Sequence, residues 1–245
     1  MITIVAIFIW IHLYFIFLLL LFSSCQEILF NDNEQKKELL LENFNVVRIF
    51  GLYNIVLIQD STDRVVINGK NDVNSITAVV INDTLTIDDH KNLSFNPNKN
   101  TLFLHFKDLK YLITYDPVNV LNLDTIKVLN FLFDAIGEIA EVKLVIDCDY
   151  FQLHNSANTL GHFYISGKSN SCMFFNRYGC SIYADSLFCK NGKIINESVG
   201  DVYVNVSERL YIFIWGPGNI YYYGTPQIDL VEKKDKGKVI PIVHR

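Results

Sequence analysis

The sequence predicts an all-β, repeat-built domain with the architecture of a β-solenoid or β-prism. From Phe44 onward, short runs of β-branched and aromatic residues are interrupted every few residues by Asn, Asp or Gly, which is typical of short strands joined by turns. In the second half, a Gly-x-apolar-Tyr unit recurs, and an internal repeat of this length indicates stacked coils. An antiparallel β-sandwich is the alternative, because its strands recur at similar spacing.

The N-terminal segment predicts export. Residues 2–22 contain no Asp, Glu, Lys or Arg, and they are followed by Ser23-Ser24-Cys25. Two small residues before a cysteine form the pattern that a lipoprotein signal peptidase cleaves, so we expect residues 1–24 to be a signal peptide and Cys25 to carry the lipid. The start lacks a basic residue, and Phe22 stands where Leu is commoner. A retained transmembrane helix and plain secretion therefore remain alternatives.

The rest of the chain divides into a tether and one domain. Residues 25–42 are rich in polar and charged side chains, which suits a solvated tether behind the lipid. Residues 43–245 have the length and composition of a single repeat-built domain. In its first part we expect strands at residues 45–50, 54–59, 64–68, 76–81, 84–88 and 102–106, because each is a β-branched or aromatic run bounded by turn residues.

The second part of the domain consists of repeated units of strand, turn and strand. The units begin at Gly161, Gly179, Gly200 and Gly218, which lie 18, 21 and 18 residues apart. The strands that precede the first three end at Asn155, Asn176 and Asn196. We expect Asn and Gly at these corners because they tolerate a left-handed backbone, and we expect stacked coils to bury one continuous apolar column.

With the repeat laid out, the chain resembles the putative auto-transporter adhesin head GIN domain family of bacterial envelope lipoproteins. Residues 44–59 are similar to the family's opening strand pair, and residues 210–226, with Gly216-Pro217-Gly218 and Tyr223-Gly224-Thr225-Pro226, are similar to its closing hairpin and exit. Trp215 and Pro217 replace small residues usual in the family. The resemblance covers residues 43–226; it implies a β-repeat fold and an envelope role, and it assigns no binding residue.

Composition argues against several partners. The net charge is −5 and no cluster of Lys or Arg occurs, so we expect no nucleic acid partner. The cysteines Cys148, Cys172, Cys180 and Cys189 form no Cys-x-x-Cys pair, and we predict no metal site. These thiols either fill slots in the core or form disulfides, such as Cys148–Cys172 or Cys172–Cys189. No cofactor is expected, because no phosphate-binding or dinucleotide motif is present.

One carboxylate pair invites a catalytic interpretation. Asp147 and Asp149 flank Cys148 on an extended segment, so strand alternation directs both carboxylates to one face and the sulfur to the other. This arrangement would suit a β-helix lyase or glycosidase, which is the alternative function. Solvent-facing Asp residues are ordinary on a half-buried strand, and we predict no catalytic residue. A deep groove with either Asp beside Lys or Arg would favour the enzyme, whereas a smooth column with an exposed aromatic stripe would favour binding.

The candidate ligand-facing residues are aromatic. Tyr164, Tyr183, Tyr203 and Tyr221 recur at one position of the repeat, and together with Trp215 they are expected to form a stripe. A solvent-facing stripe would suit a glycan or protein ligand; stacked aromatics also stabilise solenoids without a ligand. We therefore expect a non-catalytic binding, adhesion or structural domain, held at the bacterial cell envelope as an outer-membrane lipoprotein.

Overall fold

The computed structural model describes residues 35–69, 72–89, 100–156 and 158–242. The chain separates into two units, residues 1–33 and 34–245, and every described residue belongs to the second. The predicted signal peptide and the expected lipid attachment at Cys25 lie outside the described residues. The described part contains sixteen strands. None of its segments is a helix long and apolar enough to cross a membrane.

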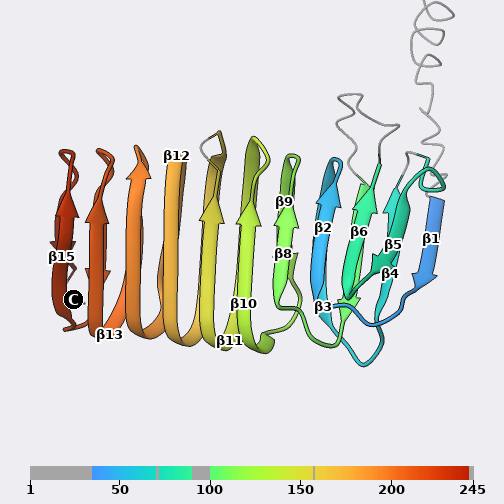
Figure 1. The fold of residues 1–245 in the computed structure, drawn as a ribbon, viewed down its shortest axis with the longest axis horizontal. Coiled ribbons are helices and arrows are strands. Elements are labelled where there is room, and N and C mark those ends of the chain that lie inside the picture. Colours follow the sequence, from blue (N-terminus) through green and yellow to red (C-terminus); the bar gives the residue numbers. More distant parts are fainter. Residues whose placement is uncertain (1–34, 70–71, 90–99, 157, 243–245) are drawn as a thin grey trace, which may run out of the picture. The chain divides into compact units, whose positions relative to one another are not determined.

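The strands wind into a β-solenoid of stacked coils, each made of two strands that face one another (Figure 1). The regular part is built from β8 (Tyr111–Thr114), β9 (Val118–Asn122), β10 (Ile126–Ala135), β11 (Ile139–Asn155), β12 (Leu160–Ser198) and β13 (Val202–Ile214). The last coils use β14 (Ile220–Tyr223), β15 (Gln227–Lys233) and β16 (Val239–Pro241). All neighbours among these strands are parallel, which rules out the antiparallel sandwich and confirms the predicted solenoid.

Long strands bend through a corner and so belong to two layers. The first part of β11 pairs with β9, and its second part pairs with β10. We call the layer containing β8, β10 and β15 layer A, and the layer containing β9, β14 and β16 layer B. Between β11 and β12 the register is constant, from Ile139 opposite Leu160 to His154 opposite Phe175. Identical repeat positions therefore align in rows along the stack.

The N-terminal coils do not follow chain order. The first coil comprises β2 (Val46–Phe50) and β3 (Tyr53–Gln59), but β6 (Thr84–Asp88) and β7 (Asn100–Phe106) form the coil beyond it, parallel to β2 and β3. The outermost strands are antiparallel, namely β5 (Thr77–Ile81) on β6, β4 (Arg64–Gly69) on β7, and β1 (Gln35–Leu40) on β4. All six strands expected in the first part of the domain are present.

Strand β1 corrects the expected boundary of the tether. Residues 35–40, placed in the tether by their polar composition, pair along their whole length with β4. Lys37 also donates from its ammonium group to the carbonyl of Ile76 at 2.7 Å. The strand is polar because it lies at the edge of layer B, where Lys side chains are well tolerated and discourage pairing with other chains.

The core is a column of apolar side chains between the two layers. Alternate residues are buried along the inner strands of the stack, as the patterns of β7 and β11 illustrate, whereas the outermost strands β1 and β5 have no buried residue. Phe131, Phe151 and Phe174 contact one another from coil to coil in tilted and edge-on arrangements, with ring centroids 5.8 and 6.0 Å apart, and all three are fully buried. No single coil could bury such a column, so the coils depend on their neighbours for stability.

The corner asparagines were predicted correctly, but for the wrong reason. Asn155, Asn176 and Asn196 are not among the residues with a left-handed backbone; their side chains are fully buried and bind corner backbone. Asn155 Nδ2 donates to the carbonyl of Arg177 at 2.8 Å, and its Oδ1 accepts from the Arg177 N–H at 3.0 Å. These amides replace backbone hydrogen bonds that a corner interrupts.

Two repeat glycines are required by close backbone contact. A Cβ at Gly200 would lie 2.0 Å from the carbonyl oxygen of Cys180, and one at Gly218 would lie 2.0 Å from that of Gly200. Neither glycine has a positive φ. Glycine is therefore needed at these positions because the backbones of neighbouring coils lie too close for a Cβ atom, and not because of its backbone conformation.

Candidate functional site

The four repeat tyrosines form a continuous ladder on the outer face of layer B. Tyr183 lies opposite Tyr203, which lies opposite Tyr221. From Tyr164 to Tyr221 the successive ring centroids are 4.9, 5.3 and 4.7 Å apart, and adjacent rings are tilted by only 10°, 13° and 6°. The spacing is close to that of neighbouring strands, so parallel register stacks the rings.

Stacking determines which surface the ladder offers. The ring faces cover one another, so Tyr183 and Tyr203 present ring edges and hydroxyl groups to solvent. At one end the ammonium of Lys143 lies 5.8 Å from the centroid of Tyr164, and Tyr164 is the most exposed residue of the ladder, at 41%. Burial raises the pKa of the Tyr203 hydroxyl. The ladder is therefore a row of hydroxyls rather than a flat aromatic platform.

Trp215 lies apart from this ladder. Its ring meets Phe175 and Phe213 edge-on, with centroids 6.2 and 6.0 Å away. Both partners belong to the layer A parts of β12 and β13. Trp215 Nε1 donates to Glu232 at 2.6 Å, and the Lys234 ammonium lies 4.5 Å from the ring centroid. The structure thus separates the expected stripe into two aromatic groups on opposite layers.

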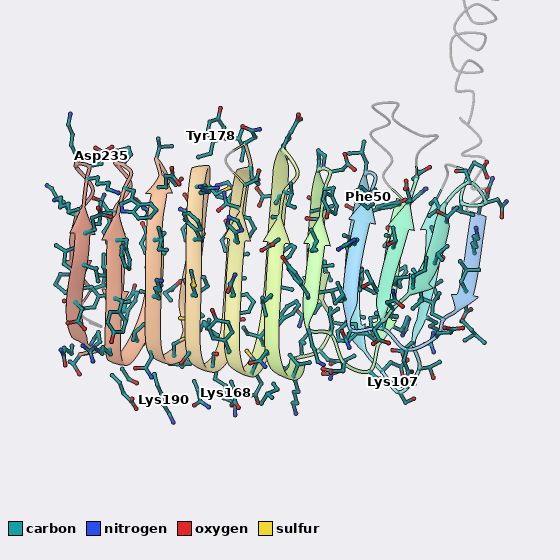
Figure 2. All side chains as sticks on the ribbon, in the orientation of Figure 1. Phe50, Lys107, Lys168, Tyr178, Lys190 and Asp235 are labelled. Atoms are coloured by element: carbon teal, nitrogen blue, oxygen red, sulfur yellow. The ribbon has the colours of Figure 1, made fainter. Side chains whose placement is uncertain are left out.

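A hollow of about 490 Å³ opens where β11, β12 and β13 turn from one layer to the other. Figure 2 shows Lys168 and Lys190, two of its lining residues, along one edge of the stack, while Tyr178 and Asp235 lie along the opposite edge. The lining residues are Asp147, Cys148, Asp149, Lys168, Ser169, Asn170, Phe188, Cys189, Lys190, Asn205 and Ser207.

The hollow results from a change in corner length. Ala184 pairs with Val204, but Phe188 pairs with Asn205, so residues 185–187 of β12 have no counterpart in β13. The next coil therefore turns earlier and leaves a step beside the longer corners. Within this bulge Leu187 is buried, and the following Phe188 is turned outward with 65% of its surface exposed. Bulges of this kind often re-aim side chains near functional sites.

The polar groups of the hollow include both predicted carboxylates. As expected from alternation, Cys148 is buried between Asp147 and Asp149. Asp147 lies 3.3 Å from the Lys168 ammonium, and Asp149 accepts a 2.8 Å hydrogen bond from Asn170 Nδ2. Lys190 has no ion-pair partner among the described residues. The hollow thus offers donors and acceptors in balance, with two carboxylates and two ammonium groups.

The four cysteines of the domain are buried, and two of them, Cys148 and Cys189, line the hollow. Cys148, Cys172, Cys180 and Cys189 are all free and buried, which agrees with the interpretation that they fill slots in the core. Burial raises the pKa of the Cys148 thiol to about 11, so at neutral pH it is neither a nucleophile nor a metal ligand in its usual thiolate form. No group of three metal-ligating side chains occurs within the part of the chain that the structure describes.

Sequence reasoning identified Asp147 and Asp149 but missed Phe188, Lys168, Lys190 and Asn205. One signal was present, because the interval between Gly179 and Gly200 is 21 residues whereas its neighbours are 18. The longer interval contains the bulge and Phe188. A departure from the period of a repeat is where a surface feature is most readily accommodated.

Comparison with known proteins gives a family and several solved structures of the same fold. The family model described as "Putative auto-transporter adhesin, head GIN domain" matches residues 43–226. A putative adhesin from Bacteroides fragilis NCTC 9343 has a TM-score of 0.78 at 20% identity, covering 86% of this chain and 98% of that one. No curated protein matches the chain.

Two further solved structures share the fold. A putative adhesin from Parabacteroides distasonis ATCC 8503 has a TM-score of 0.64 at 16% identity, covering 86% of this chain and 98% of that one. A protein from the same strain called a putative lipid binding protein has a TM-score of 0.58 at 16% identity, covering 86% of this chain and 95% of that one. At these identities the likeness concerns the fold alone.

Proposed function

Because the chain belongs to the putative auto-transporter adhesin, head GIN domain family, we propose that it is an exported, lipid-anchored protein of the bacterial cell envelope whose β-solenoid binds a surface ligand without catalysing a reaction. The observation that carries the proposal is the family match over residues 43–226, which includes the coils that form the tyrosine ladder and the hollow. The name of the family supports adhesion and a place at the cell surface.

The geometry suits binding. Parallel register aligns identical positions along the stack, so ligand-facing groups lie on a rigid scaffold that loses little freedom on association. The ladder and the hollow lie on the outside of the coils, whereas the column of phenylalanines fills the inside. The ladder supplies hydroxyls, and the hollow supplies an exposed ring with balanced charges.

Lipid anchoring at Cys25 is supported by the sequence alone. The uncharged run of residues 2–22 ends in Ser23-Ser24-Cys25, and the first strand begins at Gln35. Residues 26–34 would then be the tether between the lipid and layer B. This proposal places the mature domain outside the cytoplasm, on the outer membrane, with either the periplasm or the exterior as its surroundings.

The test is the intact mass and membrane partition of the full chain expressed in a bacterium with two membranes. We expect a mature chain that begins at an acylated Cys25 and sediments with the outer membrane. The variant Cys25→Ala should lose the acyl mass and leave that fraction, while the matched control Ser24→Ala, which keeps a small residue before the cysteine, should be processed normally. An unprocessed N-terminal Met1 in the membrane would refute the lipid anchor.

A carbohydrate-active enzyme is the second candidate, because Asp147 does lie beside Lys168 in a hollow. Against it, Asp147 and Asp149 come from one strand and lie on the same side of the hollow, whereas the two carboxylates of a glycosidase flank the bond that is cleaved. Release of reducing ends or of unsaturated sugars from polysaccharide, abolished by Asp147→Asn, would establish the enzyme and overturn the binding proposal.

A further inference from the structure

We propose that the hollow at the β11–β13 corner is a glycan site that takes a neutral pyranose, plain or N-acetylated, with Phe188 as the surface on which the sugar ring stacks. This inference rests on the proposed binding function and names the ligand class and the residues. It comes from three features of the hollow, namely its volume, an exposed ring that has no aromatic partner among the described residues, and a dense set of polar groups.

The first feature is the exposed ring. Phe188 is 65% exposed and makes no ring contact with any other aromatic side chain in the described part of the molecule. The rings of Tyr183 and Tyr203, by contrast, have both faces covered by neighbours. An exposed Phe on a bulge costs the folded protein apolar burial. A free ring face is the surface that the C–H groups of a pyranose can cover.

The second feature is the polar lining. A pyranose presents adjacent hydroxyl groups, each both donor and acceptor, so its site needs both kinds of partner. Here Asp147 and Asp149 accept, Lys190 donates, and the Asn170 amide is held in place by its 2.8 Å hydrogen bond to Asp149. Ser207 adds a hydroxyl whose oxygen lies 3.4 Å from the Cys189 carbonyl.

The third feature is charge and shape. Two carboxylates and two ammonium groups balance, which disfavours a highly charged anion or cation. The volume of about 490 Å³ falls within the range of roughly 300–1,000 Å³ of small-molecule sites. A peptide added as a strand would need a free sheet edge, but the hollow lies at the corners of internal coils, where the gap in pairing between Ala184 and Phe188 is only three residues long.

The floor of the hollow offers no thiolate nucleophile. The floor is formed by Cys148 and Cys189, which are 7% and 4% exposed. Cys148 remains a thiol at neutral pH and lies 3.7 Å from the Ser169 hydroxyl. The floor is thus apolar and inert, and the polar groups stand on the rim.

The experiment titrates the full chain, in a sugar-free zwitterionic detergent, with the methyl glycosides of glucose, galactose, mannose and N-acetylglucosamine and with short linear oligomers of each. Saturation-transfer NMR identifies the sugar that binds, and calorimetry gives its dissociation constant. We expect at least one sugar to bind. Phe188→Ala should weaken it about tenfold, the value for an aromatic contact of roughly 1.4 kcal/mol.

Matched variants make the result specific. Phe188→Tyr keeps a ring and should retain affinity, whereas Phe188→Leu keeps only bulk and should lose it. Asn170→Ala should also weaken binding. Val199→Ala is the control, because Val199 is 68% exposed and its backbone N–H donates to the carbonyl of Tyr178, at the opposite edge of the stack. Circular dichroism of each variant verifies that it is folded.

Each outcome decides the proposal. Binding that all Phe188 and Asn170 variants retain would place the sugar elsewhere and overturn this site, while leaving adhesion intact. Failure of every sugar to bind would overturn the glycan class; attachment of cells bearing the protein to surfaces would still test adhesion separately. Capture of a peptide by the hollow in place of sugars would likewise refute the inference.

Discussion

Replacing the corner asparagines should reveal how much stability their side-chain amides supply. Asn155 makes three hydrogen bonds, from Nδ2 to the carbonyls of Ser156 and Arg177 and from the Arg177 N–H to Oδ1. Asn176 makes two, from Nδ2 to the carbonyl of Cys180 and to Asn196 Oδ1. Its own Oδ1 is buried without a hydrogen-bond partner.

The two asparagines should therefore respond differently to Ala. A net value of about 1 kcal/mol per hydrogen bond gives a loss of about 3 kcal/mol for Asn155→Ala. For Asn176→Ala the two lost hydrogen bonds lower the stability by about 2 kcal/mol. Removal of the buried, unpaired Oδ1 stabilises the protein by roughly 1 kcal/mol, so the net loss of stability is about 1 kcal/mol. The Cys180 carbonyl also keeps its hydrogen bond from the Ser198 hydroxyl at 2.8 Å.

The assay is thermal unfolding followed by circular dichroism. For a domain of 150–250 residues, 1 kcal/mol shifts Tm by roughly 2–4 °C. Asn155→Ala should then lower Tm by about 6–12 °C and Asn176→Ala by about 2–4 °C. Because repeat proteins can unfold in segments, the two variants are also compared by the midpoint of equilibrium unfolding in urea. Equal losses for the two variants, or a larger loss for Asn176→Ala, would refute the account of the corners.

Two further predictions concern the ladder and the thiols. Tyr203 stacks on two tyrosine rings, whereas Tyr221 stacks on one. At roughly 0.5–1.5 kcal/mol per aromatic pair, Tyr203→Ala should therefore lose about twice as much stacking energy as Tyr221→Ala in the same denaturation assay. Equal losses of stability would contradict this prediction. Burial raises the pKa of Cys148 from 9.0 to about 11. Because the pKa of this thiol is higher in the folded state, its contribution to stability is complete below pH 9 and declines as the pH rises towards 11. The Tm of the wild type should therefore fall between pH 9 and 11, and the Tm of Cys148→Ala should fall less. A Tm independent of pH between 9 and 11 would exclude the effect.

Local patterns in the sequence were sufficient for the elements and the repeat. The six strands of the first part were located because β-branched runs bounded by turn residues leave few other conformations open. The Gly-x-apolar-Tyr units were found because stacking forces equivalent residues into equivalent environments, and the aligned Tyr203 and Tyr221 are the direct result. The alternation of Asp147, Cys148 and Asp149 follows from the two-residue period of any strand.

Other features depend on which strands become neighbours. The sequence does not show this, because side chains alternate with a period of two residues in parallel and antiparallel strands alike. Only the tertiary structure decided that β6 and β7 extend the stack beyond β2 and β3 and that the polar residues 35–40 form β1. It also placed Trp215 on the layer opposite the tyrosines, because β13 turns a corner between residues 206 and 209.

The sequence by itself therefore determined that the domain is an all-β repeat with tyrosines at one repeat position and asparagines at the corners, because these depend on local spacing; the parallel register of the structure decided between stacked coils and a sandwich. The hollow with Phe188 was decided by the tertiary structure, because a step exists only where a long corner lies beside a shorter one. The difference in length is visible in the sequence, but its position relative to Asp147, Lys168 and Asn205 is a property of three coils in contact.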